Sequence, residues 1–233
     1  MSRLARAHLT AVDPVLGAHI RAIGPCTLQP DRTREPYAAL VSAIAHQQLH
    51  GRAAQTILDR LYAHHDGACP DPGHLLSLSE TTLRACGFSG AKIAALHDIA
   101  RHSLSGIIPT RRAAARMSDA ALIERLCAVR GVGRWTVEML LIFTLGRPDI
   151  FPVADFGVRE GYRLLHALPT QPKPRDFAII GEAFAPYRST AAWYLLRAAD
   201  AAKKIPPTLP IATQQAKSPA SARSVSGNPR SER

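Results

Sequence analysis

Apolar residues return at helical spacing over most of the first 205 positions of the chain. Residues 37–48 (YAALVSAIAHQQ) show this pattern directly after Pro36, a residue suited to the first turn of a helix. Residues 52–63 repeat the pattern after Gly51, which separates the two segments. Further helices are predicted over residues 79–86, 90–103, 118–130, 134–145, 156–166, 175–185 and 189–203. Alternating strand patterns with hairpin turns are absent, so the sequence predicts an all-α fold.

The predicted helices divide into two helical subdomains with a cleft between them. We expect residues 37–146 to form a central bundle, and residues 1–36 to pack with residues 147–205 as the second subdomain. Residues 206–233 differ in kind, because they hold five Pro and five Ser but no aromatic residue. This stretch cannot bury enough apolar surface to offset the entropy lost on ordering, so we predict a disordered basic tail.

Composition excludes several classes of protein. With 233 residues, 46% of them hydrophobic, the chain can bury a substantial interior. Its apolar runs fall short of the roughly 20 residues that span a bilayer, and its first residues lack the apolar block of a secretory signal. We therefore expect no contact with membranes. The expected location is the cytoplasm, at the bacterial nucleoid when the protein acts.

The cysteines are too far apart in sequence for a zinc or iron–sulfur motif. They are Cys26, Cys69, Cys86 and Cys127. Isolated cysteines in a chain without a secretory signal are typical of reduced, mostly buried thiols. The sequence therefore predicts no metal site.

Charge is the first indication of a partner. The chain carries 29 basic and 18 acidic residues, for a net charge of +11, and only five of the basic residues are Lys. Arg forms planar, bidentate hydrogen bonds to phosphate, so a basic, Arg-rich chain favours a nucleic-acid partner. A GC-rich genome would also explain the many Arg residues. The tail contributes +3, so most of the charge belongs to the helical part.

The most informative segment is residues 126–139, LCAVRGVGRWTVEM. One predicted helix ends near Arg130, the chain turns through Gly131, Val132 and Gly133, and a second helix begins. The two glycines permit a tight turn and a close approach of a ligand, and Val132 can tuck between the helices. The first amides of the second helix lack intrahelical partners, which makes them a cradle for an anion. An ordinary glycine-capped turn would explain the glycines alone. The fuller pattern resembles the helix-hairpin-helix DNA-binding motif.

A second segment follows about twenty residues later, at 149–162, DIFPVADFGVREGY. Asp155 comes after an extended, Pro-containing stretch and directly before a predicted helix. Such an Asp is suited to capping the helix, because its oxygens accept hydrogen bonds from free amides. Those same hydrogen bonds favour the ionised carboxylate, so a functional role is compatible with capping.

Together these segments resemble the helix-hairpin-helix DNA glycosylase superfamily. Two further stretches, AIAHQQLHGRAAQTI at residues 43–57 and FAPYRSTAAWYLLR at residues 184–197, are similar to its alkylation-repair branch, the AlkA-type DNA-3-methyladenine glycosylases. The resemblance covers roughly residues 36–200. It implies an enzyme of base excision repair that flips an alkylated purine, of the 3-methyladenine or 7-methylguanine type, out of double-stranded DNA and hydrolyses its N-glycosidic bond.

The chain departs from its relatives in three ways. Larger AlkA-type members carry an extra N-terminal mixed α/β domain, for which the roughly 35 residues before the first strong motif leave no room. Bifunctional relatives carry a Lys at the position of Trp135, so we expect a monofunctional enzyme without Lys-based lyase activity. Some relatives hold a C-terminal four-cysteine iron–sulfur cluster, but no cysteine follows Cys127.

The resemblance also implies roles for residues of the active site. Asp155 would stabilise positive charge on the deoxyribose, orient the attacking water, or do both. Trp135, Tyr187 and Met139 are candidate walls of the base pocket. Stacking of a cationic purine on an aromatic face contributes roughly 0.5–2 kcal/mol. Ordinary packing is the alternative for these residues, and it is the better interpretation for Trp193.

Contacts to DNA are expected from the hairpin and from the turn after residue 47. Base flipping leaves a gap in the duplex, and the turn at Gln48, Leu49 and His50 is the candidate wedge, with Gln47 beside it. Core packing is the alternative for Leu49 and His46. The remaining candidates would hold the phosphate backbone through amides, a hydroxyl group or guanidinium groups: Gly131, Val132, Gly133, Arg134, Thr136, Arg52 and Arg188.

We expect a monomer that needs no cofactor, although family hairpins often place a monovalent cation between backbone carbonyls and phosphate. Two alternatives stay open. The chain could be a non-catalytic helix-hairpin-helix module that recognises DNA structure, which would bind DNA and release no base. It could also be a glycosylase for deaminated or oxidised bases, because pocket shape decides the lesion. The joint motifs argue against a helical protein whose basic charge is incidental.

Overall fold

The computed structural model describes residues 3–49 and 51–204. His50 and the tail predicted over residues 206–233 lie outside the described residues. Every regular element within the described stretches is a helix, which confirms the predicted all-α fold. None of these helices combines the length and the hydropathy that a membrane crossing requires.

The helices, in chain order, are α1 (Arg3–Val12), α2 (Pro14–Ile23), α3 (Pro36–His46), α4 (Gly51–Tyr62), α5 (Pro72–Ser77), α6 (Glu80–Cys86), α7 (Gly90–Leu104), α8 (Arg111–Ala114), α9 (Asp119–Cys127), α10 (Arg134–Leu140), the π-helix η1 (Leu141–Leu145), α11 (Phe156–Leu165), α12 (Pro174–Glu182) and α13 (Arg188–Lys204). Each range predicted to be helical overlaps at least one of these elements. Four helices were not predicted. Residues 1–36 were assigned to the second subdomain without individual helices, and they hold α1 and α2. The other two, α5 and α8, begin at side-chain caps, Asp71 and Thr110, but are too short to show a periodic pattern.

The segment predicted as one helix over residues 134–145 consists of α10 and the wider turn of η1. Two carbonyls of η1 accept hydrogen bonds from residues that are distant in the sequence. The amide of Asp31 donates to the Phe143 carbonyl at 2.9 Å, and a guanidinium nitrogen of Arg111 donates to the Thr144 carbonyl at 2.9 Å. Gly146, in the left-handed conformation, then ends the segment. Partners far away in the sequence therefore satisfy backbone groups in this segment, which its own periodicity could not show.

A first hydrophobic core lies among α3 to α10. Leu40 and Ile44 on α3 face Leu96 and Ile99 on α7, and all four side chains are fully buried. Burial of each such side chain contributes about 1.5–3 kcal/mol. This core therefore fixes the position of α3 and α10, the two helices that border the site described below.

A second hydrophobic core joins the two ends of the described chain. Leu9 and Leu16, from α1 and α2, pack with Phe177 and Tyr194, from α12 and α13. Gly161 of α11 lies directly against the backbone of α13, where a Cβ atom would overlap the carbonyl of Leu195. The absence of a side chain at this position allows the two helices to pack closely.

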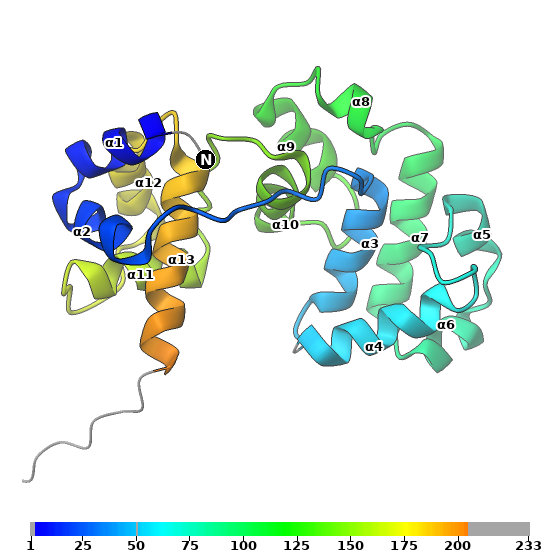
Figure 1. Ribbon diagram of the computed structural model, residues 1–233. Helices are drawn as coiled ribbons and strands as arrows, with labels where there is room; N and C mark the ends of the chain where they lie inside the picture. The colour runs from blue at the N-terminus through cyan, green and yellow to red at the C-terminus, as the bar shows by residue number, and fades with distance from the viewer. Residues whose placement is uncertain (1–2, 50, 205–233) are drawn as a thin grey trace, which may run out of the picture.

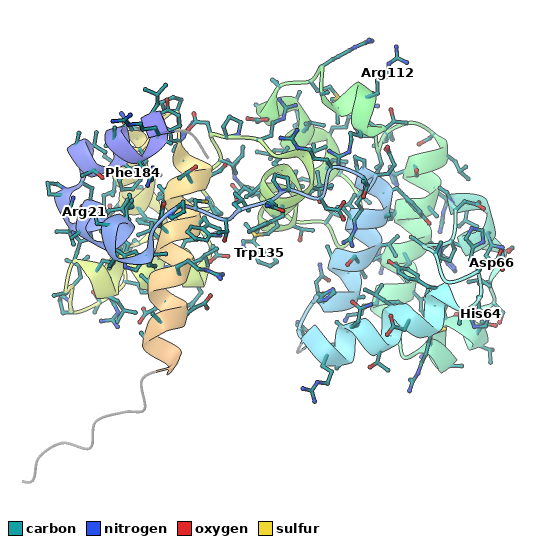
Figure 2. All side chains as sticks on the ribbon, in the orientation of Figure 1. Arg21, His64, Asp66, Arg112, Trp135 and Phe184 are labelled. Carbon is teal, nitrogen blue, oxygen red and sulfur yellow. The ribbon has the colours of Figure 1, made fainter. Side chains whose placement is uncertain are left out.

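Figure 1 shows the two groups of helices side by side, with α1, α2, α11, α12 and α13 in one group. The extended segment between α2 and α3 crosses from this group to the other, and the segment between η1 and α11 crosses back. We propose that the two cores correspond to the two subdomains expected from the sequence. Figure 2 places the side chain of Trp135 between the two groups.

Candidate active site at the hairpin

The hairpin, defined here as residues 128–133, joins α9 to α10 at the edge of the first core. Gly131 has a φ of +78°, and a Cβ atom there would lie 2.9 Å from the Cβ of Ala95. Both facts favour glycine at this position. Val132 is only 4% exposed and packs into the first core. The side chain of Val132 thus anchors the turn and is not available to contact DNA directly.

The outer surface of the hairpin carries the start of α10. Gly133 is the N-cap residue and offers no side chain to the first amides of the helix. Gly131, Gly133 and Arg134 are all exposed. The first amides of a helix lack intrahelical partners and lie at the positive end of the helix dipole, so they are suited to binding a phosphate group.

Asp155 and Trp135 contact each other directly. The indole Nε1 of Trp135 donates a hydrogen bond to Oδ2 of Asp155 at 2.7 Å. The other carboxylate oxygen accepts from the amide of Val158 at 2.9 Å, which confirms that Asp155 caps α11. Trp135 is 47% exposed, so its ring is open to a ligand. Capping therefore holds the carboxylate in place while its second oxygen faces the indole.

A pocket of about 410 Å³ lies between the end of α3 and the start of α10. Its volume falls within the usual range for small-ligand sites and suits a flat, purine-sized ring. The pocket is lined by Ala43, His46, Gln47, Gln48, Trp135, Thr136 and Met139. The structure thus brings Trp135 and Met139, two of the three predicted pocket residues, to one cavity.

Sequence reasoning missed Ala43 as a pocket residue and considered His46 only as a core candidate. Both lie on α3 at a spacing of three residues, so they share one helix face. The ring Nδ1 of His46 donates to the Ser42 carbonyl at 2.9 Å, and the residue is exposed rather than packed in the core. The spacing was visible in the sequence, but nothing in it identified which face borders α10.

The turn after α3 contains the residues predicted to enter the duplex. Gln47 donates from Nε2 to the carbonyl of Gly131 at 2.9 Å, and thereby links this turn to the hairpin. Gln48 and Leu49 are exposed, Leu49 to 41%. The core-packing alternative for Leu49 is therefore wrong, and the side chain is available as a wedge.

Tyr187 does not reach the pocket, contrary to the prediction. It packs against the second core, where its ring makes an edge contact with the ring of His8 at 5.5 Å between centroids. Tyr187 lies in the turn that joins α12 to α13, in the group of helices opposite α3. Trp193 is buried in the same core, as expected.

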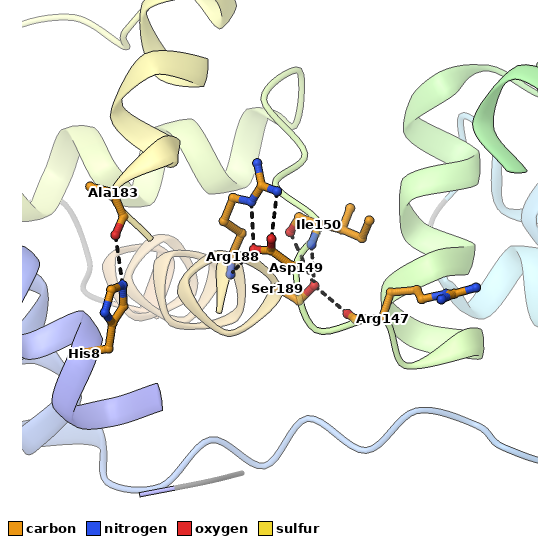
Figure 3. Close-up of polar contacts among 7 residues, drawn as sticks. All are labelled: His8, Arg147, Asp149, Ile150, Ala183, Arg188 and Ser189. Atoms are coloured by element: carbon orange, nitrogen blue, oxygen red, sulfur yellow. Dashed lines mark hydrogen bonds and ion pairs between the residues drawn. The ribbon is translucent and has the colours of Figure 1, made fainter. Parts of the chain in front are cut away.

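Arg188 was predicted to contact phosphate, but the structure gives it another partner. Its Nε and Nη2 donate to the two carboxylate oxygens of Asp149, both at 2.8 Å, and its amide donates to Oδ1 at 3.2 Å. Figure 3 shows this pair beside Ser189, whose hydroxyl donates to the carbonyl of Arg147 at 2.7 Å. The guanidinium lowers the pKa of the Asp149 carboxyl. Arg188 therefore serves to hold the segment between the cores.

The other predicted contacts differ in exposure. Arg52, on α4, is exposed, and the side chain of Arg134 is 67% exposed. Thr136 is buried and lines the pocket, so its hydroxyl is not on the outer surface where a phosphate would lie. It lies three residues after the hairpin, where α10 already packs on α3, and the sequence could not show this contact.

Glu138 is a buried acid that sequence reasoning did not single out. It is 2% exposed, and Oε1 accepts from the Nε of Arg134 at 2.9 Å. Burial raises the pKa of the Glu138 carboxyl, the Arg134 guanidinium opposes that shift, and the negative charge of Asp155 adds to it. The i,i+4 spacing of Arg134 and Glu138 was a usable signal for the pair.

Within residues 3–49 and 51–204, the structure holds no group of three or more His, Cys, Asp or Glu side chains arranged to bind a metal ion.

Comparison with known proteins gives consistent results. Residues 41–186 match the HhH-GPD superfamily of base excision DNA repair proteins. DNA-3-methyladenine glycosylase 1 of Schizosaccharomyces pombe is 41% identical over 210 residues, which cover 88% of this chain and 91% of that protein.

Solved structures are similar over most of the chain. A Schizosaccharomyces pombe 3-methyladenine DNA glycosylase in complex with abasic DNA superposes with a TM-score of 0.76 at 41% identity, and the match covers 83% of this chain and 95% of that one. A DNA-3-methyladenine glycosidase from Bacillus halodurans superposes with a TM-score of 0.77 at 31% identity, covering 86% and 91%. On this evidence the chain belongs to the HhH-GPD superfamily of base excision DNA repair proteins.

Proposed function

We propose that this protein is a monofunctional DNA glycosylase that removes alkylated purines, of the 3-methyladenine and 7-methylguanine type, from double-stranded DNA. The contact between Trp135 and Asp155 beside the pocket carries the proposal, because it combines an aromatic face with a carboxylate. The relatives named above are DNA-3-methyladenine glycosylases, and one of them was solved with abasic DNA.

Binding begins at the phosphate backbone. The free amides at the start of α10 and the exposed Arg134 and Arg52 supply positive charge along one strand. A monovalent cation between hairpin carbonyls and phosphate stays a prediction. We further propose that the protein acts as a monomer.

Extrusion of the base follows binding. Rotating a nucleotide out of the stack costs a few kcal/mol, and less where alkylation has weakened pairing. The exposed side chain of Leu49 fills the gap, and the base enters the pocket between α3 and α10. The alkylated ring is cationic, so it stacks favourably on the indole of Trp135.

Hydrolysis then breaks the bond between C1′ and the base nitrogen. The bonding electrons leave with the base, which was cationic and departs as a neutral purine. Positive charge develops on the deoxyribose, and a water oxygen adds at C1′ with loss of a proton. The Asp155 carboxylate stabilises that charge and accepts a hydrogen bond from the water. No lysine occupies the position of Trp135, so the product is an intact abasic site.

A base-release assay across a panel of modified duplexes tests the proposal. Each duplex carries one 3-methyladenine, 7-methylguanine, hypoxanthine, ethenoadenine or oxidised purine, and abasic products are revealed by alkaline cleavage. We expect release of the two methylated purines by the wild-type protein. Binding with no abasic product from any duplex would instead indicate a non-catalytic DNA-binding module. Release of only the deaminated or oxidised bases would overturn the proposed substrate class.

A further inference from the structure

Lys92, near the start of α7, is a half-buried cation that the proposed mechanism does not use. Its Nζ donates to the carbonyls of Ala45 and Gln47, at 2.9 Å and 2.8 Å. Both carbonyls lie at the end of α3, where backbone acceptors lack intrahelical partners and the helix dipole is negative. Burial lowers the pKa of Lys92, so the ammonium group depends on these acceptors in place of water.

The second of these carbonyls belongs to the peptide plane that joins Gln47 to Gln48. Gln48 has a φ of +59°, a left-handed conformation that is unfavourable for a residue with a Cβ atom. A hydrogen bond to the preceding carbonyl fixes the orientation of that plane. Lys92 therefore supports the strained residue that comes directly before the exposed Leu49.

The same face of α7 also supports the hairpin. One turn after Lys92, Ala95 packs under Gly131, and one turn later Oδ2 of Asp98 accepts from the amide of Arg130 at 2.8 Å. Gln47 closes the connection through its hydrogen bond to the Gly131 carbonyl. Residues spaced by three on one helix thus contact both the turn after α3 and the hairpin.

We propose that Lys92 is a positioning residue for base extrusion, which holds the turn carrying Gln48 and Leu49 in register with the hairpin. It touches neither the base nor the reacting atoms, and it acts through the Gln47 peptide. This inference rests on the proposed function. It predicts a defect confined to substrates in which a base pair must be broken.

The test compares two duplexes that each carry a single 7-methylguanine. In one duplex the lesion is paired with cytosine, and in the other it lies opposite an abasic analogue, where extrusion breaks no base pair. Single-turnover release is measured for the wild type, Lys92→Met, Lys92→Arg and the control Lys173→Met, an exposed lysine at the start of α12.

We expect Lys92→Met to slow release from the paired duplex about tenfold or more, and from the unpaired duplex by less than about threefold. Lys92→Arg restores most of the paired rate, because a guanidinium also donates to two carbonyls. Lys173→Met matches the wild type. Thermal unfolding checks that the variants are folded; if Lys92→Met is not, Lys92→Ala, which also lacks a side-chain donor, is judged by the same criterion.

Three results would overturn the proposal. If Lys92→Met slows release equally from both duplexes, Lys92 has only a general structural role. If Lys92→Met releases the base from the paired duplex at the wild-type rate, Lys92 has no role in extrusion. A wild-type protein that releases no base from either duplex, nor from the lesion panel, would contradict the proposed function itself, and the proposal with it. The wild-type rate therefore separates failure of the proposed function from failure of the Lys92 assignment.

Discussion

Two aspartates, Asp149 and Asp155, lie in the segment between η1 and α11, and their surroundings differ in charge. Asp149 is held by the guanidinium of Arg188 through both oxygens. Asp155 accepts from an indole N–H and a backbone amide, which are neutral donors. No ion pair to Asp155 occurs among the described residues.

The difference separates two uses of one residue type. A guanidinium neutralises a carboxylate and fixes the backbone around it. Neutral donors also orient a carboxylate, but they leave its negative charge available to a neighbouring cation. Asp149 is therefore suited to structure, and Asp155 to stabilising a cationic sugar.

The largest effect is expected at Asp155. Asn is a good N-cap residue, so Asp155→Asn keeps α11 in place and removes only the charge and the indole acceptor. We expect base release to fall roughly 100- to 1,000-fold, the usual loss when one preorganised electrostatic group is removed. Single-turnover kinetics measure the rate, and gel-shift titration checks that DNA affinity is retained. Full activity in this variant would show that the charge of Asp155 does not contribute to base release, and would contradict the functional role that separates it from Asp149.

The next effect tests the neutral donor. Trp135→Phe keeps an aromatic face over the pocket and removes the N–H that holds Asp155. Loss of a hydrogen bond to a charged group corresponds to about a tenfold slower release. Trp135→Leu also removes the aromatic ring, and we expect it to lose further activity on cationic bases. If Phe and Leu variants both keep the wild-type rate and lesion profile, Trp135 serves only in packing.

A stability effect is expected at Asp149. Asp149→Asn breaks the paired contact with Arg188, at a cost of about 1–2 kcal/mol, because the pair is partly buried. This corresponds to a fall in Tm of roughly 3–6 °C for a chain of this size. Calorimetry measures the shift, and base release well below the Tm stays at the wild-type rate. A strong loss of activity with no change in Tm would contradict the structural role.

The smallest effect concerns pH. The pKa of Asp149 is lowered by Arg188, and the pKa of Glu160 is lowered to about 2 by hydrogen bonds from Arg163 and Gln171. A lowered folded-state pKa means that these contacts stabilise the protein above the ordinary carboxyl pKa, and that this stability disappears as the pH falls toward the folded-state value. We expect Glu160→Gln to lose under about 1 kcal/mol at neutral pH, because the group lies near the surface. Thermal unfolding at several pH values between neutral and acid should show a shallower dependence in this variant. If the dependence of Tm on pH is the same as in the wild type, these hydrogen bonds do not lower the pKa of Glu160 in the folded state relative to the unfolded state.

Local patterns were enough for several features. Helical spacing predicted the helices from α3 onward except α5 and α8, and the two glycines beside Val132 predicted the hairpin. The position of Asp155 before a helical segment predicted its capping role. Each of these depends on interactions between residues close in sequence, which local residue types specify.

Contacts between distant residues decided the rest. The sequence could not show that Arg188 would meet Asp149, that Tyr187 would face the second core, or that Thr136 would be buried. It did not indicate Lys92 either, which acts 45 residues away from its acceptor Gln47. The sequence by itself determined an all-α, hairpin-containing chain with an acid capping a helix. Only the tertiary structure decided which charges are neutralised and which remain available, because pairing of charges depends on the packing of helices that are far apart in the chain.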